Sequence, residues 1–532
     1  MATHHDFIII GAGSAGCVLA NRLSADGASV LLVEAGPPDR SALIHIPGLF
    51  STLYRQGRFA WEYRTVPQRH VDGRVMRDVR GKVLGGSSST NGMLYCRGAA
   101  ADYDGWAAMG NGGWSYADIL PYFRRAEDHA DGADAFHGTG GPLKVQRSRM
   151  NHPLARAFVE AALEAGHPYS ADINGADRQG FGPADSTIAG GKRWSAAQAY
   201  LRPAAARSNL EILTGAQATR ILTEGSRAIG VELALKGDRV RRVGGEIILA
   251  AGALQSPHLL MLSGIGPADH LRRAGVMPHI DLPGVGSNLH DHASVTVHAA
   301  CAYRGTLAKL LNPVHAAGAF LRYIVRKDGV MGECSIEASG TMRTPGAAVP
   351  DIKCQFVPIP LDPVSGLPIR NHGMINRMEL TVPESRGTLR LASSDPFAAP
   401  LIDPNYLAEP ADRAKLRFAI RGAIEIFRQP AFAPFGVEPL LPVADMDDDA
   451  ALDAYVRATL TNDHHAAGTC AMGNGPDAVV DARLRVHGVE GLRVVDASIM
   501  PKVVSGNTNA PVIMIAEKAS DMIMGRENAA AG

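Results

Sequence analysis

Two adjacent histidines near the C-terminal end of the chain stand just before a Gly-Thr turn. The run Asp463-His464-His465-Ala466-Ala467-Gly468-Thr469 places two imidazoles side by side. Histidine is the usual side chain for accepting a proton near neutral pH, because its ordinary pKa is about 6.5. Asp463 can raise the pKa of a neighbouring histidine by favouring its charged form. From these residues alone, either His464 or His465 could be a general base.

A second chemical signal occupies the first thirty-six residues. Asp6–Ile10 is a short apolar run that ends at Gly11, and Gly11, Gly13 and Gly16 follow at the spacing of a dinucleotide fingerprint. Residues 14–24 carry apolar side chains at helical spacing, and a second apolar strand over 30–33 ends in Glu34. Such glycines let a pyrophosphate approach the start of a helix, and the carboxylate takes the ribose hydroxyls. We therefore predict a dinucleotide site, and Glu34 argues against a 2'-phosphate; FAD and NAD both remain open at this point.

Composition excludes several classes of protein. Lysine plus arginine equals aspartate plus glutamate at 53 each in 532 residues, so no overall charge favours nucleic acid. The six cysteines stand singly without a Cys-x-x-Cys pair, which argues against a zinc site and a disulfide framework. No apolar run approaches the ~20 residues of a spanning helix, and residues 1–5 are too short for a signal peptide. We expect a cytoplasmic α/β enzyme.

The stretch from Gly81 to Asn91 is rich in glycine and serine. It reads Gly-Lys-Val-Leu-Gly-Gly-Ser-Ser-Ser-Thr-Asn and can hold neither a long helix nor a strand. Small side chains, exposed N–H groups and hydroxyls suit close approach to a flat ring or to phosphate oxygens. The stretch is therefore predicted to be a binding loop rather than a flexible linker.

Two stretches together resemble one known family. Residues 81–91 are similar to the first signature of the glucose-methanol-choline (GMC) family of FAD-dependent alcohol oxidoreductases, and residues 252–266 are similar to its second. Asn174-Gly175, Arg193, Ser195 and Tyr200-Leu201-Arg202-Pro203 also fall where the family has similar residues. Within the family, the chain resembles the bacterial sorbose, polyethylene glycol and choline dehydrogenases. The resemblance implies that the dinucleotide is FAD.

The resemblance also implies where the cofactor lies. Thr90 stands where members with covalent flavin can carry histidine, so noncovalent FAD is expected. Asp496 and the Ala497 backbone match the family's closing FAD contact. The residues expected to contact FAD are Gly11, Gly13, Ser14, Ala15, Glu34, Ala35, Gly81, Val83, Gly86, Ser87, Asn91, Gly92, Met93, Ala218, Ala251, His464, Asp496, Ala497, Asn507 and Thr508.

The catalytic residues follow from the same resemblance. Gly468 and Thr469 match the family's His-Pro-x-Gly-Thr segment, which selects His465 as the base although Ala466 replaces the usual proline. Asn507 matches the second catalytic position, where an amide can hold the substrate oxygen, and Asn509 is expected to be a helix cap. The implied mechanism is proton abstraction by His465 with hydride transfer from the alcohol carbon to flavin N5.

The expected fold is α/β, with a Rossmann-like FAD-binding domain of the GMC type and a second α+β substrate domain on an antiparallel sheet. The expected FAD-binding parts are 1–150, 203–300 and 463–532, with a loop excursion over about 37–75. Residues 151–202 are expected to be a substrate-side and connecting segment, and 301–462 to form the substrate domain, with strands near 352–358 and 379–383. The apolar stripe of Leu416, Ala419, Ile420, Ala423 and Phe427 is expected to face the core.

Several alternatives remain at this stage. The favoured function is oxidation of a primary alcohol, sugar or polyol, with electrons passed to a non-oxygen acceptor such as a quinone. An alcohol oxidase that releases H2O2, a hydroxynitrile lyase-like enzyme and a flavoprotein without turnover are the others. Residues 307–324 are expected to form a helical cover rather than a membrane contact, and His290-Asp291-His292 a polar loop rather than metal ligands. Glu333, Glu337, Gln355 and Phe356 are candidate pocket residues, although core packing is the commoner role.

Overall fold

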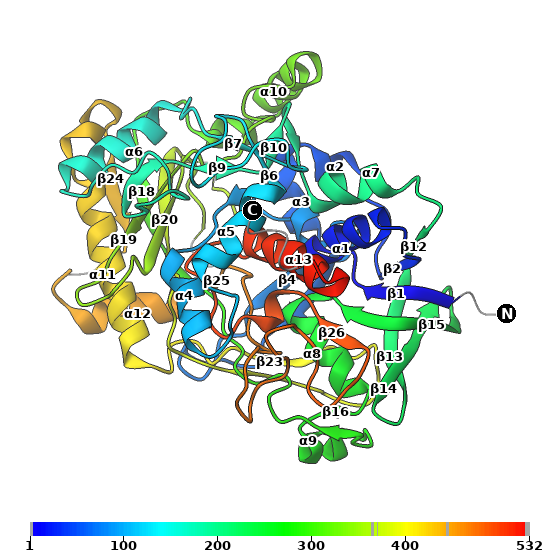
Figure 1. Cartoon of the computed structure of the whole chain (residues 1–532). Helices are drawn as coiled ribbons and strands as arrows, with labels where there is room; N and C mark the ends of the chain where they lie inside the picture. The colour runs from blue at the N-terminus through cyan, green and yellow to red at the C-terminus, as the bar shows by residue number, and fades with distance from the viewer. Residues whose placement is uncertain (1–3, 363–366, 370, 443–445, 527–532) are drawn as a thin grey trace.

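The computed structural model describes residues 4–362, 367–369, 371–442 and 446–526. Two seven-stranded sheets dominate it (Figure 1). The first has the order β12-β2-β1-β15-β14-β13, with β26 also paired to β15. All its pairs are parallel except those that join β13, β14 and β15. Its strands are β1 (His4–Ile10), β2 (Val30–Glu34), β12 (Leu210–Thr214), β13 (Ala216–Glu224), β14 (Arg227–Leu235), β15 (Asp238–Leu249) and β26 (Leu492–Val494).

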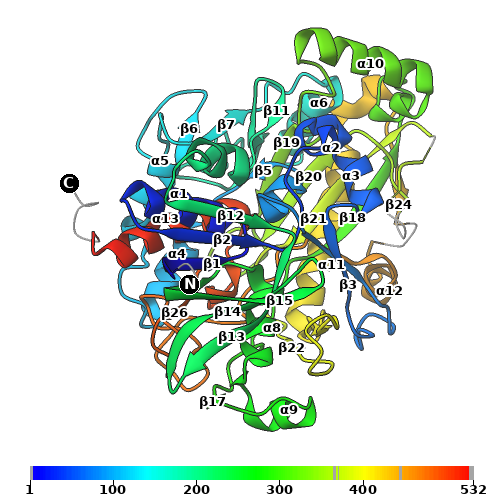
Figure 2. The same cartoon turned by 90° about the vertical axis from the view of Figure 1, so that its right-hand side faces the viewer.

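The predicted strand-helix-strand unit at the N-terminus is confirmed. β1 and β2 pair in parallel, and α1 (Ser14–Ala25) begins three residues after Gly11. β2 is buried along its whole length, as expected for a parallel strand covered on both faces. Helix α13 (Asn509–Met524) packs beside α1, and the two first strands lie under them (Figures 1 and 2). Both ends of the chain therefore build the nucleotide side.

The second sheet is antiparallel and has the order β24-β18-β21-β20-β19-β8, with β25 also paired to β18. The predicted stripe on α11 (Pro410–Phe427) is confirmed as core, since Leu416 and Ile420 are fully buried. Helix α6 packs on the same sheet, and α12 packs on α11. The bounds are β8 (Gly180–Pro183), β18 (Ala293–Ala300), β19 (Ala338–Met342), β20 (Ile352–Val357), β21 (Gly373–Leu380), β24 (Glu438–Leu441), β25 (Thr461–Asn462), α6 (Pro153–Glu164) and α12 (Asp449–Thr459).

Shorter elements connect the two sheets. The excursion over 37–75 holds helices and a strand instead of only loop: α2 (Ala42–His45), α3 (Phe50–Gln56) and β3, whose partner is β4. The remaining elements are β3 (Ala60–Arg64), β4 (Arg77–Gly81), β5 (Leu94–Tyr95), α4 (Ala100–Ala108), α5 (Tyr116–Ala126), β6 (Glu127–His129), β7 (Leu143–Arg147), β9 (Asp185–Ser186), β10 (Ile188–Ala189), β11 (Lys192–Arg193), α7 (Arg202–Ala204), α8 (Gly252–Leu262), β16 (Ile265–Gly266), α9 (Ala268–Arg273), β17 (Ile280–Asp281), β22 (Thr388–Arg390) and β23 (Leu401–Asp403).

Two strands lie elsewhere than the sequence suggested. β18 lies in the second sheet, where it pairs with β21, so this sheet includes residues 293–300, which were expected on the FAD-binding side; along the chain, its first strand is β8. The strand expected over 379–383 is instead β21, which begins at Gly373. Both errors have one cause: a buried strand is an apolar run on either sheet, and its partner is a long-range fact that the run does not carry.

Helix α10 (Pro313–Arg326) stands out from the body, at the top of Figures 1 and 2. Only Tyr323 of this helix is buried, while Val314 and Val325 are 77% and 72% exposed. Before it, η4 (Leu307–Leu311) contributes Leu307 and Leu310 to the wall of the central cavity. The segment thus edges the cavity as a cover would, with an exposed outer face. Within the described ranges, no helix combines the length and apolar character that crossing a membrane requires.

Candidate active site

One cavity of about 1260 Å³ runs between the two sheets. Its wall begins at the fingerprint glycines and Glu34, passes the loop over 81–93, and ends at His465 and Asn507. The substrate-side sheet contributes Gln355, Val357 and Ile375. Because the carboxyl ends of β1 and β2 open at the same edge, the nucleotide end lies where parallel sheets bind their ligands.

The nucleotide end is shaped for close backbone approach. Gly11 has a φ of +101°, and a Cβ there would stand 2.6 Å from the Ala250 carbonyl oxygen. Gly86 has a φ of +52°, and its Cβ would stand 2.7 Å from Gly13 Cα. No side chain fits at either position, so the fingerprint turn and the loop over 81–91 are in backbone contact. The start of α1 then presents free N–H groups to the cavity, as a pyrophosphate requires.

Glu34 closes this end of the cavity. Its carboxylate oxygens accept hydrogen bonds from the N–H groups of Ala12 (3.0 Å) and Gly36 (2.8 Å). Burial raises the pKa of Glu34 to about 7, although both N–H groups and Lys82 oppose the rise. Each carboxylate oxygen has a further lone pair, so the side chain can still accept from two ribose hydroxyls. The carboxylate acceptors of Glu34, together with the N–H donors at the start of α1, therefore fit an adenosine dinucleotide.

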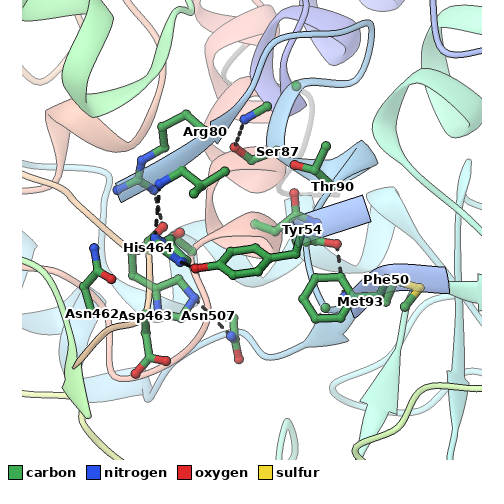
Figure 3. A pocket seen from close by; sticks show the side chains of 18 of the residues that line it. Phe50, Tyr54, Arg80, Ser87, Thr90, Met93, Asn462, Asp463, His464 and Asn507 are labelled. Carbon is green, nitrogen blue, oxygen red and sulfur yellow. Dashed lines mark hydrogen bonds between the residues drawn. The ribbon is translucent and has the colours of Figure 1, made fainter. Parts of the chain in front are cut away.

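The structure brings nearly all the predicted cofactor residues into one wall. Val83 is the exception: its side chain is fully buried away from the cavity, beside Ile44, Leu53 and Phe59. Thr90 also lines the cavity, close to Ser87 and Met93 (Figure 3). The residues that line it are Gly11, Gly13, Ser14, Ala15, Glu34, Ala35, Gly81, Gly86, Ser87, Asn91, Gly92, Met93, Ala218, Ala251, His464, Asp496, Ala497, Asn507 and Thr508.

His465 and Asn507 meet at the other end. The Nε2 atom of His465 lies 3.1 Å from the amide nitrogen of Asn507. The backbone N–H of His465 donates to Asp291 (2.6 Å), and Asp291 also accepts from the Tyr406 hydroxyl (3.1 Å). Residues 290–292 thus form a polar loop that fixes the backbone of His465, in the way that the sequence favoured.

His464 points to a different set of partners. Its Nδ1 lies 3.2 Å from Asp78 and its Nε2 lies 3.2 Å from the Tyr54 hydroxyl. Arg80 donates to its backbone carbonyl, and Figure 3 shows Arg80, His464 and Tyr54 together on one side of the cavity. With these contacts, His464 is a packed neighbour of His465 and forms part of the cavity wall. Only one of the two histidines faces Asn507.

Sequence reasoning missed two buried charges behind His465. Glu379 on β21 and Lys353 on β20 stand directly opposite each other in the sheet, with 2.5 Å between the ammonium and the carboxylate. The other carboxylate oxygen lies 3.1 Å from His465 Nδ1 and 2.7 Å from His292 Nδ1. Lys353 also donates to the Asn507 carbonyl oxygen (2.9 Å). A charge inside each largely buried strand, Lys353 on β20 and Glu379 on β21, was the available signal, because such charges are buried only with partners.

The expected effect of Asp463 is wrong. Its carboxylate pairs with Arg377 at 2.6 Å, so its charge is already balanced. Burial lowers the pKa of His465 to about 4, and Glu379, not Asp463, is the carboxylate that opposes this change. Burial also acts to raise the pKa of Glu379, but Lys353 and the two histidines outweigh it and hold that pKa well below its usual range. At neutral pH, His465 is therefore a neutral imidazole that can accept a proton.

Comparison with known proteins identifies the family of this chain. Two family models described as GMC oxidoreductase match residues 5–294 and 383–516, which together cover more than half of the chain. The chain belongs to the GMC oxidoreductase family. Membership implies FAD as the cofactor and an alcohol as the electron donor. The fold expected from the sequence, with a parallel nucleotide sheet and an antiparallel substrate sheet, is confirmed.

Relatives of this GMC oxidoreductase span its full length. Choline dehydrogenase, mitochondrial, of Homo sapiens is 44% identical over 534 residues, covering 98% of this chain and 90% of that protein. Oxygen-dependent choline dehydrogenase of Brucella anthropi is 43% identical over 529 residues, with 98% and 96% covered. Among solved structures, pyridoxine 4-oxidase from Mesorbium loti superposes with a TM-score of 0.90 at 34% identity, covering 98% of this chain and 99% of that one.

The contact between Gly13 and Gly86 yields a first prediction. Gly86→Ala is expected to lower the flavin content of the purified protein, because the added Cβ pushes the loop away from the fingerprint turn. Gly190→Ala is the matched control: Gly190 has a φ of +54°, close to the +52° of Gly86, but nothing lies within 4 Å of its Cβ position. Each variant carries about 1–2 kcal/mol of backbone strain. Equal ratios of flavin to protein absorbance in both variants would contradict the prediction.

Proposed function

We propose that the protein is an FAD-dependent dehydrogenase that oxidises a primary alcohol with an apolar chain and passes the electrons to a quinone-like acceptor. The observation that carries the proposal is the pair of His465 and Asn507, 3.1 Å apart in a cavity whose other end is the dinucleotide fingerprint. Bound FAD supplies the hydride acceptor. The chain itself supplies a place for the alcohol, a base and a hydrogen-bond donor.

The protein's residues divide the work at the hydroxyl group. The alcohol oxygen lies within hydrogen-bond reach of His465 Nε2, which accepts its proton, and of the Asn507 amide, which donates to it. These two contacts replace the bond that the two side chains make to each other, at 3.1 Å, when no alcohol is present. As the proton leaves, negative charge develops on that oxygen. A preorganised donor is then worth more than in water, because it needs no rearrangement during the reaction. Glu379 stabilises the positive imidazole that results, since it lies 3.1 Å from Nδ1.

The cavity wall favours an apolar alcohol. Its substrate-side portion includes Leu307, Leu310, Met331, Ile336, Val357 and Ile375. A cationic alcohol such as choline needs a free aromatic face or carboxylate. The Tyr54 ring already carries the guanidinium of Arg77, 4.8 Å from its centroid, and Asp463 is paired with Arg377. Tyr54 and Asp463 are therefore committed to cations of the protein itself. The wall also holds Phe50 and Glu333, so the proposal of a neutral substrate rests on the predominance of apolar side chains on the substrate side.

Anaerobic mixing with a panel of alcohols tests the substrate class. Straight-chain primary alcohols are expected to bleach the flavin, and the concentration for half-maximal reduction is expected to fall about fourfold for each added methylene, since burying one CH2 is worth about 0.8 kcal/mol. Glycerol, sorbitol and choline are expected to act weakly. Preference for choline would overturn the substrate class. An unchanged flavin with every alcohol, together with cleavage of a cyanohydrin, would indicate a lyase.

The same preparation distinguishes a dehydrogenase from an oxidase. Under air, the proposed enzyme is expected to consume alcohol slowly and to speed up when a soluble quinone is added. Stoichiometric H2O2 at the quinone-supported rate would instead indicate an alcohol oxidase. The names of the relatives include both kinds of enzyme, so this measurement decides the acceptor.

Replacing the proposed base separates chemistry from cofactor binding. His465→Ala is expected to keep its flavin but to slow anaerobic reduction by about 100- to 10,000-fold, the usual contribution of a general base. Reduction of the same sample by dithionite should remain normal, which shows that the flavin itself is competent. Near-normal reduction by the alcohol would remove His465 from the mechanism.

We also propose that the FAD is held noncovalently. The support is Thr90, which lines the cavity between Ser87 and Asn91 and cannot form a histidyl-flavin bond. Precipitation of the purified protein with acid is expected to leave a white pellet and to release all the flavin into the supernatant. A yellow pellet would show a covalent link and would contradict this proposal.

A further inference from the structure

The orientation of the Asn507 amide is fixed by its lysine neighbour. A lysine ammonium has three donors and no acceptor, so the atom that faces Lys353 Nζ at 2.9 Å must be the amide oxygen. The amide nitrogen then faces His465 Nε2, at 3.1 Å, and can only donate to it. This assignment follows from the chemistry of the partners and does not depend on telling oxygen from nitrogen by shape.

A second donor-acceptor step fixes the proton on His465. Because Nε2 accepts from Asn507, the neutral ring carries its proton on Nδ1. Nδ1 lies 3.1 Å from Glu379 Oε1, which is the acceptor that this proton requires, and 3.0 Å from His292 Nδ1, which contacts the same carboxylate oxygen. Glu379 remains an acceptor because its other oxygen takes Lys353 at 2.5 Å and the Gln355 amide at 2.8 Å. Lys353 thus determines the hydrogen-bonding role of both ring nitrogens: Nε2 accepts because of Asn507, and Nδ1 donates because of Glu379.

We propose that Lys353 and Glu379 are a positioning pair that sets the tautomer of His465, with the proton on Nδ1 and the lone pair on Nε2, the nitrogen that faces Asn507. The pair does not line the cavity: their side chains are 1% and 0% exposed. They act through His465 and Asn507 and not on the substrate. The inference deepens the proposed function and rests on it, because the tautomer matters for turnover only if His465 is the base.

The sheet geometry explains why both residues can reach the catalytic pair. Lys353 and Glu379 are directly opposite each other on β20 and β21, and Gln355 is two residues further along β20. Side chains at alternate positions share one face of a sheet, so all three point toward the segments that carry His465 and Asn507. His292, which belongs to the polar loop over 290–292, places its Nδ1 atom 2.7 Å from Oε1 of Glu379. Glu379, Lys353 and His292 are the titratable groups that act on His465.

A structural ion pair and a metal site are the competing explanations. His292, Glu379 and His465 come close enough together to hold a metal ion. Lys353 already places a positive charge on that carboxylate, at 2.5 Å, and a divalent ion would be repelled by it. A purely structural pair would lower stability when removed but would leave the protonation site of His465 unchanged. The tautomer is therefore the decisive observable.

The test is nitrogen NMR of the histidine rings in the FAD-loaded protein, with the His465 signals assigned by their loss in His465→Gln. In the wild type, Nδ1 is expected to be protonated and Nε2 unprotonated at pH 7. In Glu379→Gln, Lys353 and Gln355 hold the new amide by its oxygen, so its NH2 group faces His465. The ring then meets an NH2 donor at each of its two nitrogens and no longer has a carboxylate acceptor at Nδ1, so the fraction of rings with the proton on Nε2 is expected to rise. An unchanged tautomer in this variant would overturn the proposal.

Kinetics give the second readout. Glu379→Gln is expected to slow flavin reduction by the alcohol about 100-fold or more, with the alcohol concentration for half-maximal reduction little changed. Lys353→Met leaves Glu379 negative and uncompensated. The His465 pKa is then expected to rise, so that the acid limb of the reduction rate moves to higher pH, whereas Glu379→Gln moves it lower. Shifts of the same sign in the two variants would contradict the pairing.

Two further variants keep the outcome interpretable. Lys415→Met is the matched control: Lys415 also pairs with carboxylates of the substrate side, at 3.3 Å from Glu384 and 3.8 Å from Asp351, and it should leave tautomer and pH profile unchanged. If a single variant does not fold, Lys353→Met with Glu379→Gln removes both charges together and keeps the Gln355 donor, so the fraction of rings with the proton on Nε2 is again expected to rise. A wild type that no alcohol reduces would defeat the proposed function, whereas the tautomer would still be measurable.

Discussion

A carboxylate buried between the two sheets is the interaction that the site depends on. Glu379 is fully buried, and an unpaired charge at such a position would cost several kcal/mol. It is retained because Lys353, Gln355, His292 and His465 surround it with donors. These partners come from strand β20, a loop and the C-terminal segment, so the ionised carboxylate on β21 holds separate parts of the chain at fixed distances. The geometry of the proposed base is one consequence of that constraint.

The proposed catalytic pair, His465 and Asn507, belongs to the nucleotide side. Between His465 and Asn507 the chain forms β26, which pairs with β15 of the first sheet. Asp496, just after β26, accepts from the Gly252 N–H (2.8 Å) and from the Ser256 hydroxyl (2.6 Å) at the start of α8. The base and the amide are therefore carried by a segment anchored in the cofactor domain. Their orienting groups come from the substrate domain, so the site is complete only where the two domains meet.

The sequence predicted what is local and missed what is assembled over distance. Strand, glycines, helix and Glu34 lie within thirty-six residues, and each signal there has a geometric reason that needs no other part of the chain. His465 was separable from His464 only through the family resemblance, because the two histidines differ in partners that are far away in sequence. Lys353 and Glu379 lie 26 positions apart in the sequence, and their pairing depends on the register of β20 and β21, which no local pattern gives. The effect expected of Asp463 on a neighbouring histidine was wrong for the same reason, since Arg377 on β21 balances its charge.

The same register explains why an asparagine can serve opposite the base. In the proposed reaction the amide of Asn507 donates to an oxygen that becomes negative, and its own carbonyl accepts from the Lys353 ammonium. A donor whose acceptor end is already bonded to a cation is polarised and donates more strongly. The cation adds no net charge to the resting site, because Glu379 balances it, so a neutral alcohol can enter without an opposing field. When the proton moves to His465, that carboxylate stabilises the new positive ring while the polarised amide holds the negative oxygen. One ion pair thus stabilises both charges that the reaction separates.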